Sequence, residues 1–138
     1  MTPDSRSVLP RSPLLSLALL VMTTAAGLVV RFAPMGLPSV VVKYGGSALW
    51  ALMIYWIVST LLSSWSLPAV ALVTGVLATA VEFFKLYHSP ALDAFRLTLP
   101  GILLLGRFFS VWDIVAYWLA IVVGVFIDKR IRQRPSRP

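Results

Sequence analysis

The chain has 138 residues, of which 59% are apolar and only 12% are charged, about half the charged share of soluble domains. A chain of this composition would expose large apolar patches in water, so an ordinary soluble domain is excluded. It has no cysteine, which excludes disulfides, thiolate metal sites and cysteine nucleophiles. The net charge is +7. Its basic residues flank apolar runs, which indicates membrane topology rather than nucleic-acid binding.

The first half of the sequence predicts a tail and two membrane spans. Residues 1–13 are polar and proline-rich and form the expected tail. The apolar run 14–30 is near the lower length limit of a transmembrane helix. It also resembles a signal peptide, with a basic start, an apolar core and small residues at Ala25 and Ala26. It continues apolar to Val30, however, which favours a span. A connector rich in turn residues follows, and the second span is expected at 40–62.

The third and fourth spans are expected at 67–84 and 111–127. A short uncharged turn precedes the third span, so spans two and three should form an antiparallel hairpin. Small residues recur at helical spacing on both later spans, which lets a neighbouring helix approach closely. We therefore expect these two spans to pack as a tight pair through Gly75, Thr79, Ala116, Ala120 and Gly124.

Residues 97–109 are apolar but too few to cross a bilayer as a helix. Pro100, Gly101 and Gly106 favour irregular backbone, so this piece is either re-entrant or interfacial. The basic residues 128–138 form a second tail. The sequence thus predicts an all-α, polytopic integral membrane helical bundle. It has four transmembrane helices plus a short re-entrant or interfacial helix, in one membrane domain over 14–127.

The basic residues predict the orientation. Seven of the twelve lie in the two tails and five lie in the connectors. The tails are therefore expected in the cytoplasm, with the connectors 31–46 and 85–110 outside. Because the difference between seven and five is small, the five cations in the outward connectors need a separate explanation. Ionisable groups near a bilayer usually have a partner or a task. The resulting polar cluster comprises Arg31, Lys43, Glu82, Lys85, Arg96, Arg107 and Asp113.

Glu82 is the most informative member of this cluster, because it follows a long apolar stretch. It either pairs with Lys85 on the same helix face or turns into a polar cavity. Asp93 and Arg96 have the spacing of a local salt bridge. Asp113 either stabilises the first turn of the fourth span through the helix dipole or pairs with Arg96, Arg107 or Arg31 across the bundle. His88 lacks nearby carboxylate ligands, so we expect no metal.

Several short segments, taken together in their order along the chain, resemble an uncharacterised bacterial membrane family, domain of unknown function 2809. The family pattern has an acid where Ser47 stands and a glutamine where Lys85 stands. A looser resemblance extends to VanZ-like proteins, with Glu82, Arg96, Asp113 and Gly124 as counterparts. Both resemblances imply a small bundle in the bacterial plasma (inner) membrane with an outward polar site. The matching segments are GLVVR at 27–31, KY at 43–44, GSALWAL at 46–52, VE at 81–82, LY at 86–87, LDAFR at 92–96, Gly101, LLG at 104–106, FSVWD at 109–113 and AY at 116–117.

Three functions follow from these observations. The first is a cell-envelope protein whose outward polar site binds an anionic lipid or envelope-precursor headgroup. The second is a structural subunit that packs against a membrane-protein partner. The third is an enzyme or transporter that uses Glu82 and Asp113. No known catalytic, phosphate-binding or dinucleotide-binding motif occurs. We therefore assign no catalytic residue and expect no cofactor.

Overall fold

The computed structural model describes residues 11–33, 35–104 and 109–132. Over these residues the chain forms six helices and no strand. Four helices are long and apolar enough to cross a membrane: α1 (Pro13–Phe32), α2 (Ser39–Leu61), α3 (Leu67–Phe84) and α6 (Val111–Arg132). Two short helices, α4 (Pro90–Arg96) and α5 (Leu99–Leu104), lie between α3 and α6. The expected all-α bundle of four candidate spans is confirmed.

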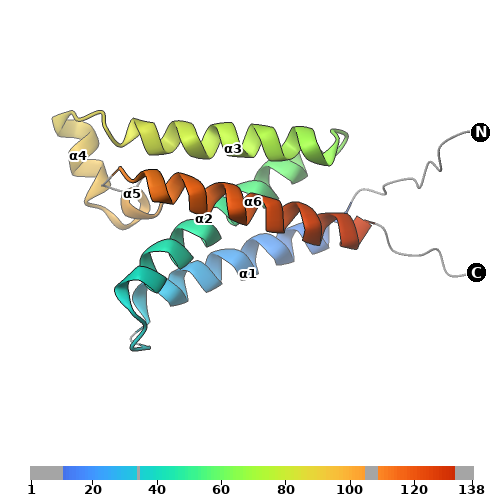
Figure 1. Cartoon of the computed structure of the whole chain (residues 1–138), viewed down its shortest axis with the longest axis horizontal. Helices are drawn as coiled ribbons and strands as arrows, with labels where there is room; N and C mark the ends of the chain where they lie inside the picture. The colour runs from blue at the N-terminus through green and yellow to red at the C-terminus, as the bar shows by residue number, and fades with distance from the viewer. Residues whose placement is uncertain (1–10, 34, 105–108, 133–138) are drawn as a thin grey trace, which may run out of the picture.

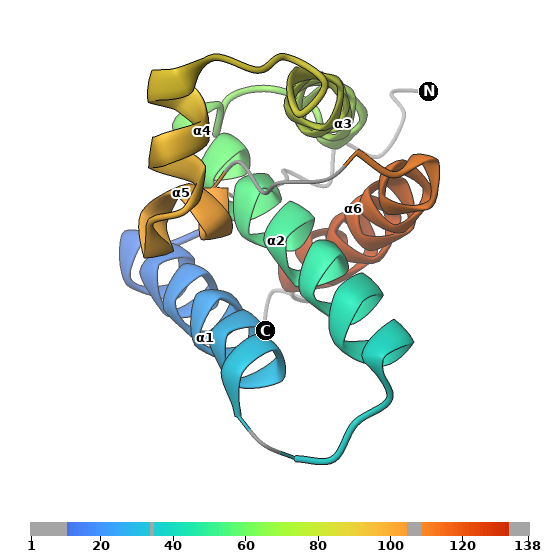
Figure 2. The same cartoon turned by 90° about the vertical axis from the view of Figure 1, so that its left-hand side faces the viewer.

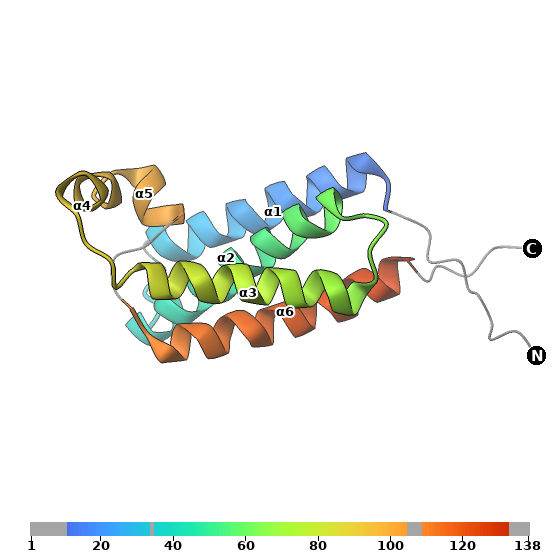
Figure 3. The ribbon, with the colours of Figure 1, turned by 90° about the horizontal axis from the view of Figure 1, so that it is seen from above.

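The four long helices alternate in direction (Figure 1). The start of α1, the α2–α3 turn and the end of α6 lie together, and we call this the terminal end. The α1–α2 connection, α4, α5 and the start of α6 lie at the opposite end, which we call the distal end. Seen from the distal end, α2 lies between α1 and α6 (Figure 2). From above, α3 and α6 run side by side (Figure 3).

Serine caps explain where three of the helices begin. The side chains of Ser12, Ser66 and Ser89 accept hydrogen bonds from the backbone N–H three residues later, at 3.2, 3.4 and 3.2 Å. A proline follows in the first turn of each helix. Proline suits this position because it has no N–H that the helix would leave unpaired. The serine caps therefore fix the starts of α1, α3 and α4.

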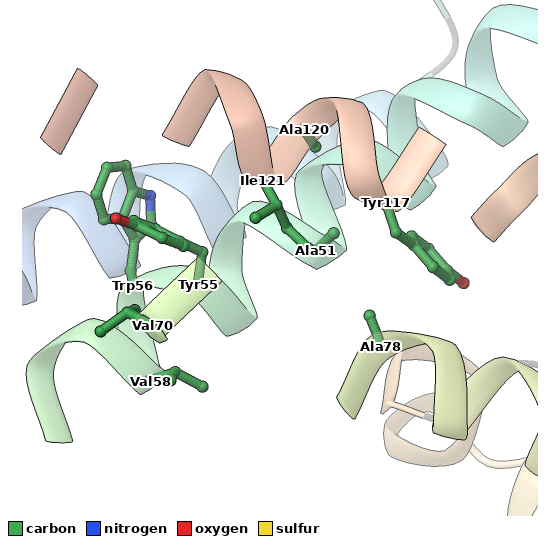
Figure 4. Close-up of a cluster of buried hydrophobic side chains, with 9 residues drawn as sticks. All are labelled: Ala51, Tyr55, Trp56, Val58, Val70, Ala78, Tyr117, Ala120 and Ile121. Carbon is green, nitrogen blue, oxygen red and sulfur yellow. The ribbon is translucent and has the colours of Figure 1, made fainter. Parts of the chain in front are cut away.

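The core lies where α2 meets its neighbours. Tyr55 and Trp56 of α2 are fully buried there, and their rings meet edge to face with centroids 5.2 Å apart. Trp56 Nε1 donates to Thr23 Oγ1 of α1 at 3.0 Å, so the indole N–H is satisfied inside the bundle. Figure 4 shows this cluster, whose buried apolar members are Ala51, Tyr55, Trp56, Val58, Val70, Ala78, Tyr117, Ala120 and Ile121.

Glycines set two of the helix contacts. Gly75 of α3 lies under the Trp118 ring of α6, where an added Cβ would overlap the indole. Trp118 Nε1 donates to Thr79 Oγ1 at 3.2 Å, which joins the same two helices. Gly124 lies instead against Leu52 and Tyr55 of α2. Gly124 therefore packs against α2 rather than against α3, where we expected it. Ala120 is buried and Ala116 is half-buried.

The distal segment folds more regularly than we expected. Besides the apolar piece at 97–109, it contains α4, which the apolar pattern does not indicate. α4 and α5 form a tight pair, because Gly101 lies so close to the Phe95 carbonyl that no Cβ would fit. Residues 105–108, which include Gly106 and Arg107, lie outside the described residues. The choice between a re-entrant and an interfacial position stays a prediction.

Candidate functional site

Glu82 lies at the end of α3, and its side chain is fully buried. Its carboxylate accepts hydrogen bonds from Tyr117 Oη at 2.6 Å and from the Ser110 N–H at 2.8 Å. Lys85 Nζ lies 2.7 Å from the same oxygen that binds Tyr117. Both carboxylate oxygens are thus engaged, and the charge has a partner of opposite sign. This arrangement joins the end of α3 to the start of α6 and favours the local ion pair over an open catalytic carboxylate.

Asp113 is buried in the first turn of α6. Ser47 Oγ of α2 lies 3.0 Å from Asp113 Oδ1, and the same hydroxyl lies 3.0 Å from the Lys43 carbonyl. Among the described residues, Asp113 has no ion-pair partner, so the proposed pairing with Arg31 or Arg96 is not formed. Ser47 and Lys85 each lie beside an acid, Asp113 and Glu82 respectively.

Arg96 is buried, and its guanidinium is used within the fold. It donates to the backbone carbonyls of Phe84 and Tyr87 at 2.8 Å each. It also lies 3.4 Å from Asp93, which is the local salt bridge that the spacing predicts. Asp93 in turn lies 3.1 Å from the exposed ring of His88. Arg96 therefore holds α4 against the end of α3, and its donors face the protein's own backbone.

Arg31 and Lys43 are the exposed cations of the predicted cluster. Arg31 lies in the last turn of α1 and makes one long hydrogen bond, of 3.4 Å, to the Ile102 carbonyl of α5. Lys43 Nζ lies 5.3 Å from the centre of the Tyr44 ring. Arg107 lies outside the described residues. Among the described residues, the structure therefore divides the cluster into buried groups that are bound within the fold and two exposed cations.

An apolar cavity of about 310 Å³ opens beside Arg31, between α1, α2 and α5. It is within the range of small-molecule sites, about 300–1,000 Å³. Leu28, Leu49 and Met53 supply much of its apolar wall, and Arg31 supplies the charged group. Gly27 and Gly46 also line it, and an added Cβ at Gly46 would meet nothing within 4 Å. We call this space the distal cavity.

A second ionic group lies at the terminal end, where the sequence predicts only the two tails and a short turn. Asp128 is fully buried, and it accepts hydrogen bonds from Tyr55 Oη and Arg132 Nε, each at 2.9 Å. Arg11, which precedes α1, lies 3.2 Å from the same carboxylate and 5.0 Å from the centre of the Trp56 ring. Burial lowers the pKa of the Arg11 guanidinium, an effect that Asp128 opposes. We call Arg11, Tyr55, Asp128 and Arg132 the terminal ionic cluster.

One signal in the sequence indicates part of this cluster. Asp128 and Arg132 are four residues apart, the spacing of a helical ion pair. A helix that continues past 127 would place both on one face, and α6 does continue to Arg132. The contact of Arg11 has no comparable local signal, because it joins residues from opposite ends of the chain.

Comparison with known protein families places most of the chain in a family. The model of a family described as a protein of unknown function (DUF2809) matches residues 36–124. This range includes Glu82, Ser47 and Asp113, and it ends before the terminal ionic cluster is complete. We found no match to the chain among curated proteins or solved structures.

Proposed function

The chain belongs to this family of unknown function, and we propose that it binds an anionic lipid at its distal end. In this proposal one acyl chain occupies the distal cavity and the headgroup phosphate meets Arg31. The observation that carries the proposal is the exposed guanidinium beside an apolar cavity of about 310 Å³. An amphiphile with a negative headgroup matches both parts of this site.

The chemistry of Arg31 supports a phosphate ligand. A guanidinium has five N–H donors in a planar fork that matches phosphate geometry. Arg31 uses one nitrogen, in a long bond to the Ile102 carbonyl. Its exposed side chain therefore has donors to offer. Lys43 lies three residues before Gly46 on α2, so it adds a second positive charge near the same cavity.

Lys85 and Arg96, two other cations of the expected cluster, do not serve this site. Lys85 is paired with buried Glu82, and Arg96 is bound to backbone carbonyls. Glu82 and Asp113 are also engaged with neighbouring side chains. An acid–base or proton-coupling role would need at least one of these carboxylates to face a substrate or water. The distal cavity is therefore a better basis for a function than the acids.

Lipid retention in nanodiscs tests the proposal. The protein is compared in phosphatidylglycerol and phosphatidylcholine, with bound lipid counted by native mass spectrometry. Arg31→Gln is expected to weaken phosphatidylglycerol binding about tenfold, since it removes a charged hydrogen-bond donor. Gly46→Leu is expected to reduce binding by filling the cavity while the Arg31 charge remains. Arg130→Gln is the matched control, because Arg130 is exposed at the opposite end. Equal binding by all variants would contradict the proposal.

A further inference from the structure

The terminal ionic cluster contains more positive than negative charge. Arg11 and Arg132 each contribute one positive charge, and their side chains are 2% and 3% exposed. Among the described residues, Asp128 is the one acid between them, and Tyr55 donates to it as a neutral hydroxyl. The buried group therefore has an excess of one positive charge. An uncompensated buried charge is costly, so a nearby anion would stabilise the cluster.

A cavity lies beside one of the two guanidiniums. Its volume is about 670 Å³, and Arg132 lines it together with the α2–α3 turn. The turn contributes the hydroxyl groups of Ser63, Ser64 and Ser66, and the indole of Trp65. Ser66 Oγ already caps α3 through the Ala69 N–H. The cavity thus combines a buried cation with hydroxyls that donate hydrogen bonds. We call it the terminal cavity.

The surroundings favour a lipid as the source of the anion. Trp65 is 49% exposed at the end of the bundle, and tryptophan is enriched at the membrane interface. Lys129 and Arg130 are exposed on the last turn of α6. Juxtamembrane cations of this kind attract anionic lipids. The amino end of α3, which lies at the same turn, adds a partial positive charge from the helix dipole.

We propose that the terminal cavity binds the phosphate of an anionic lipid in the leaflet at the terminal end. Arg132 forms an ion pair with the phosphate, whose negative charge offsets the excess positive charge of the cluster. Ser63 and Ser64 donate hydrogen bonds to the phosphate oxygens. Trp65 lies beside the glycerol region. This site lies at the opposite end from the distal cavity and does not depend on it. The protein would then hold one anionic lipid at each end of its bundle.

Amide hydrogen exchange tests the terminal cavity separately from the distal cavity. In nanodiscs, phosphatidylglycerol is expected to protect the amides of residues 62–67 relative to phosphatidylcholine. Ser63→Ala with Ser64→Ala is expected to weaken this effect about tenfold in lipid titrations. Arg132→Gln is expected to weaken it at least as much, and Lys43→Gln, which removes an exposed charge at the opposite end, is its matched control. The serine variant leaves Asp128 and its partners unchanged, so it tests the site even if Arg132→Gln fails to fold.

The remaining outcomes distinguish the alternatives. Arg31→Gln is expected to leave protection of the α2–α3 turn unchanged, so failure of the distal site would not affect this result. Equal protection by both lipids, or full protection in the serine variant, would overturn the terminal site. A further arm adds inorganic phosphate to phosphatidylcholine nanodiscs. Protection by phosphate alone would overturn the lipid assignment.

Discussion

Arg11 and Asp128, which lie near opposite ends of the sequence, form an ion pair of 3.2 Å in which both side chains are buried. Arg11 also donates to Ser59 and Thr60 of α2. The contact thereby ties the residue before α1 to α2 and α6. Two residues that the charge pattern assigns to cytoplasmic tails, Arg11 and Arg132, are therefore internal parts of the bundle. The exposed cations of the last turn are Lys129 and Arg130.

Removing the carboxylate of Asp128 should destabilise the whole bundle. Asp128→Asn would leave two buried guanidiniums without a counter-charge, and breaking a buried pair costs about 3–5 kcal/mol. The free energy of unfolding in mixed micelles measures the effect. Lys129→Gln is the control, because Lys129 is exposed next to Asp128 in the sequence and exposed charges contribute about 0–1 kcal/mol. Similar losses in both variants would contradict the internal role of Asp128.

Glu82 and Lys85 should behave as a coupled pair. Glu82→Gln leaves Lys85 as an unpaired buried cation, so it should destabilise the protein by about 3–5 kcal/mol. Adding Lys85→Gln removes that cation, and the double variant should be less destabilised than the sum of the single variants. Unfolding free energies of the four proteins complete the cycle. Additive losses would show that the two charges do not interact.

Two glycine-to-alanine variants should have opposite effects. Gly75→Ala would displace the Trp118 ring and break its hydrogen bond to Thr79, at a cost of about 1–3 kcal/mol. Gly46→Ala meets nothing within 4 Å, so the gain in helix propensity should leave stability unchanged or raise it by about 1 kcal/mol. Thermal unfolding followed by tryptophan fluorescence measures both. Equal stability of the two variants would contradict the α3–α6 contact.

The orientation can be tested cleanly because the chain has no cysteine. The two variants are Ser64→Cys, in the α2–α3 turn, and His88→Cys, shortly before α4. Both positions are exposed. The charge pattern predicts that a membrane-impermeant maleimide added to whole cells labels position 88 alone. Lysed cells provide the control, in which both positions should react. Labelling of position 64 in intact cells would show that the orientation is opposite to the predicted one.

The long helices could be predicted from the sequence because each is a sustained apolar run with clear breaks. The starts of α1 and α3 also follow from a serine and a proline in the right order. α4 could not be predicted from hydropathy, since it has only seven residues and two of them are charged. Its position depends on Arg96, whose donors reach carbonyls at the end of α3.

The candidate site was harder to predict than the fold. Local spacing correctly pairs Glu82 with Lys85 and Asp93 with Arg96. Spacing carries no information on contacts between distant helices, such as Tyr117 with Glu82, Ser47 with Asp113 or Arg11 with Asp128. The distal cavity also depends on the packing of three helices. Which cations stay exposed is therefore decided by tertiary structure.

Photocrosslinking with an acyl-labelled lipid tests the central claim most directly. Phosphatidylglycerol with a photoreactive group on one chain is added to the protein in nanodiscs, and adducts are mapped by mass spectrometry. The proposal predicts concentrated labelling at Leu28, Leu49 and Met53, which line the distal cavity. Arg31→Gln should reduce this labelling, and Arg130→Gln should not. Labelling spread evenly over the lipid-facing surfaces of α3 and α6, and unchanged by Arg31→Gln, would contradict a lipid site in the distal cavity.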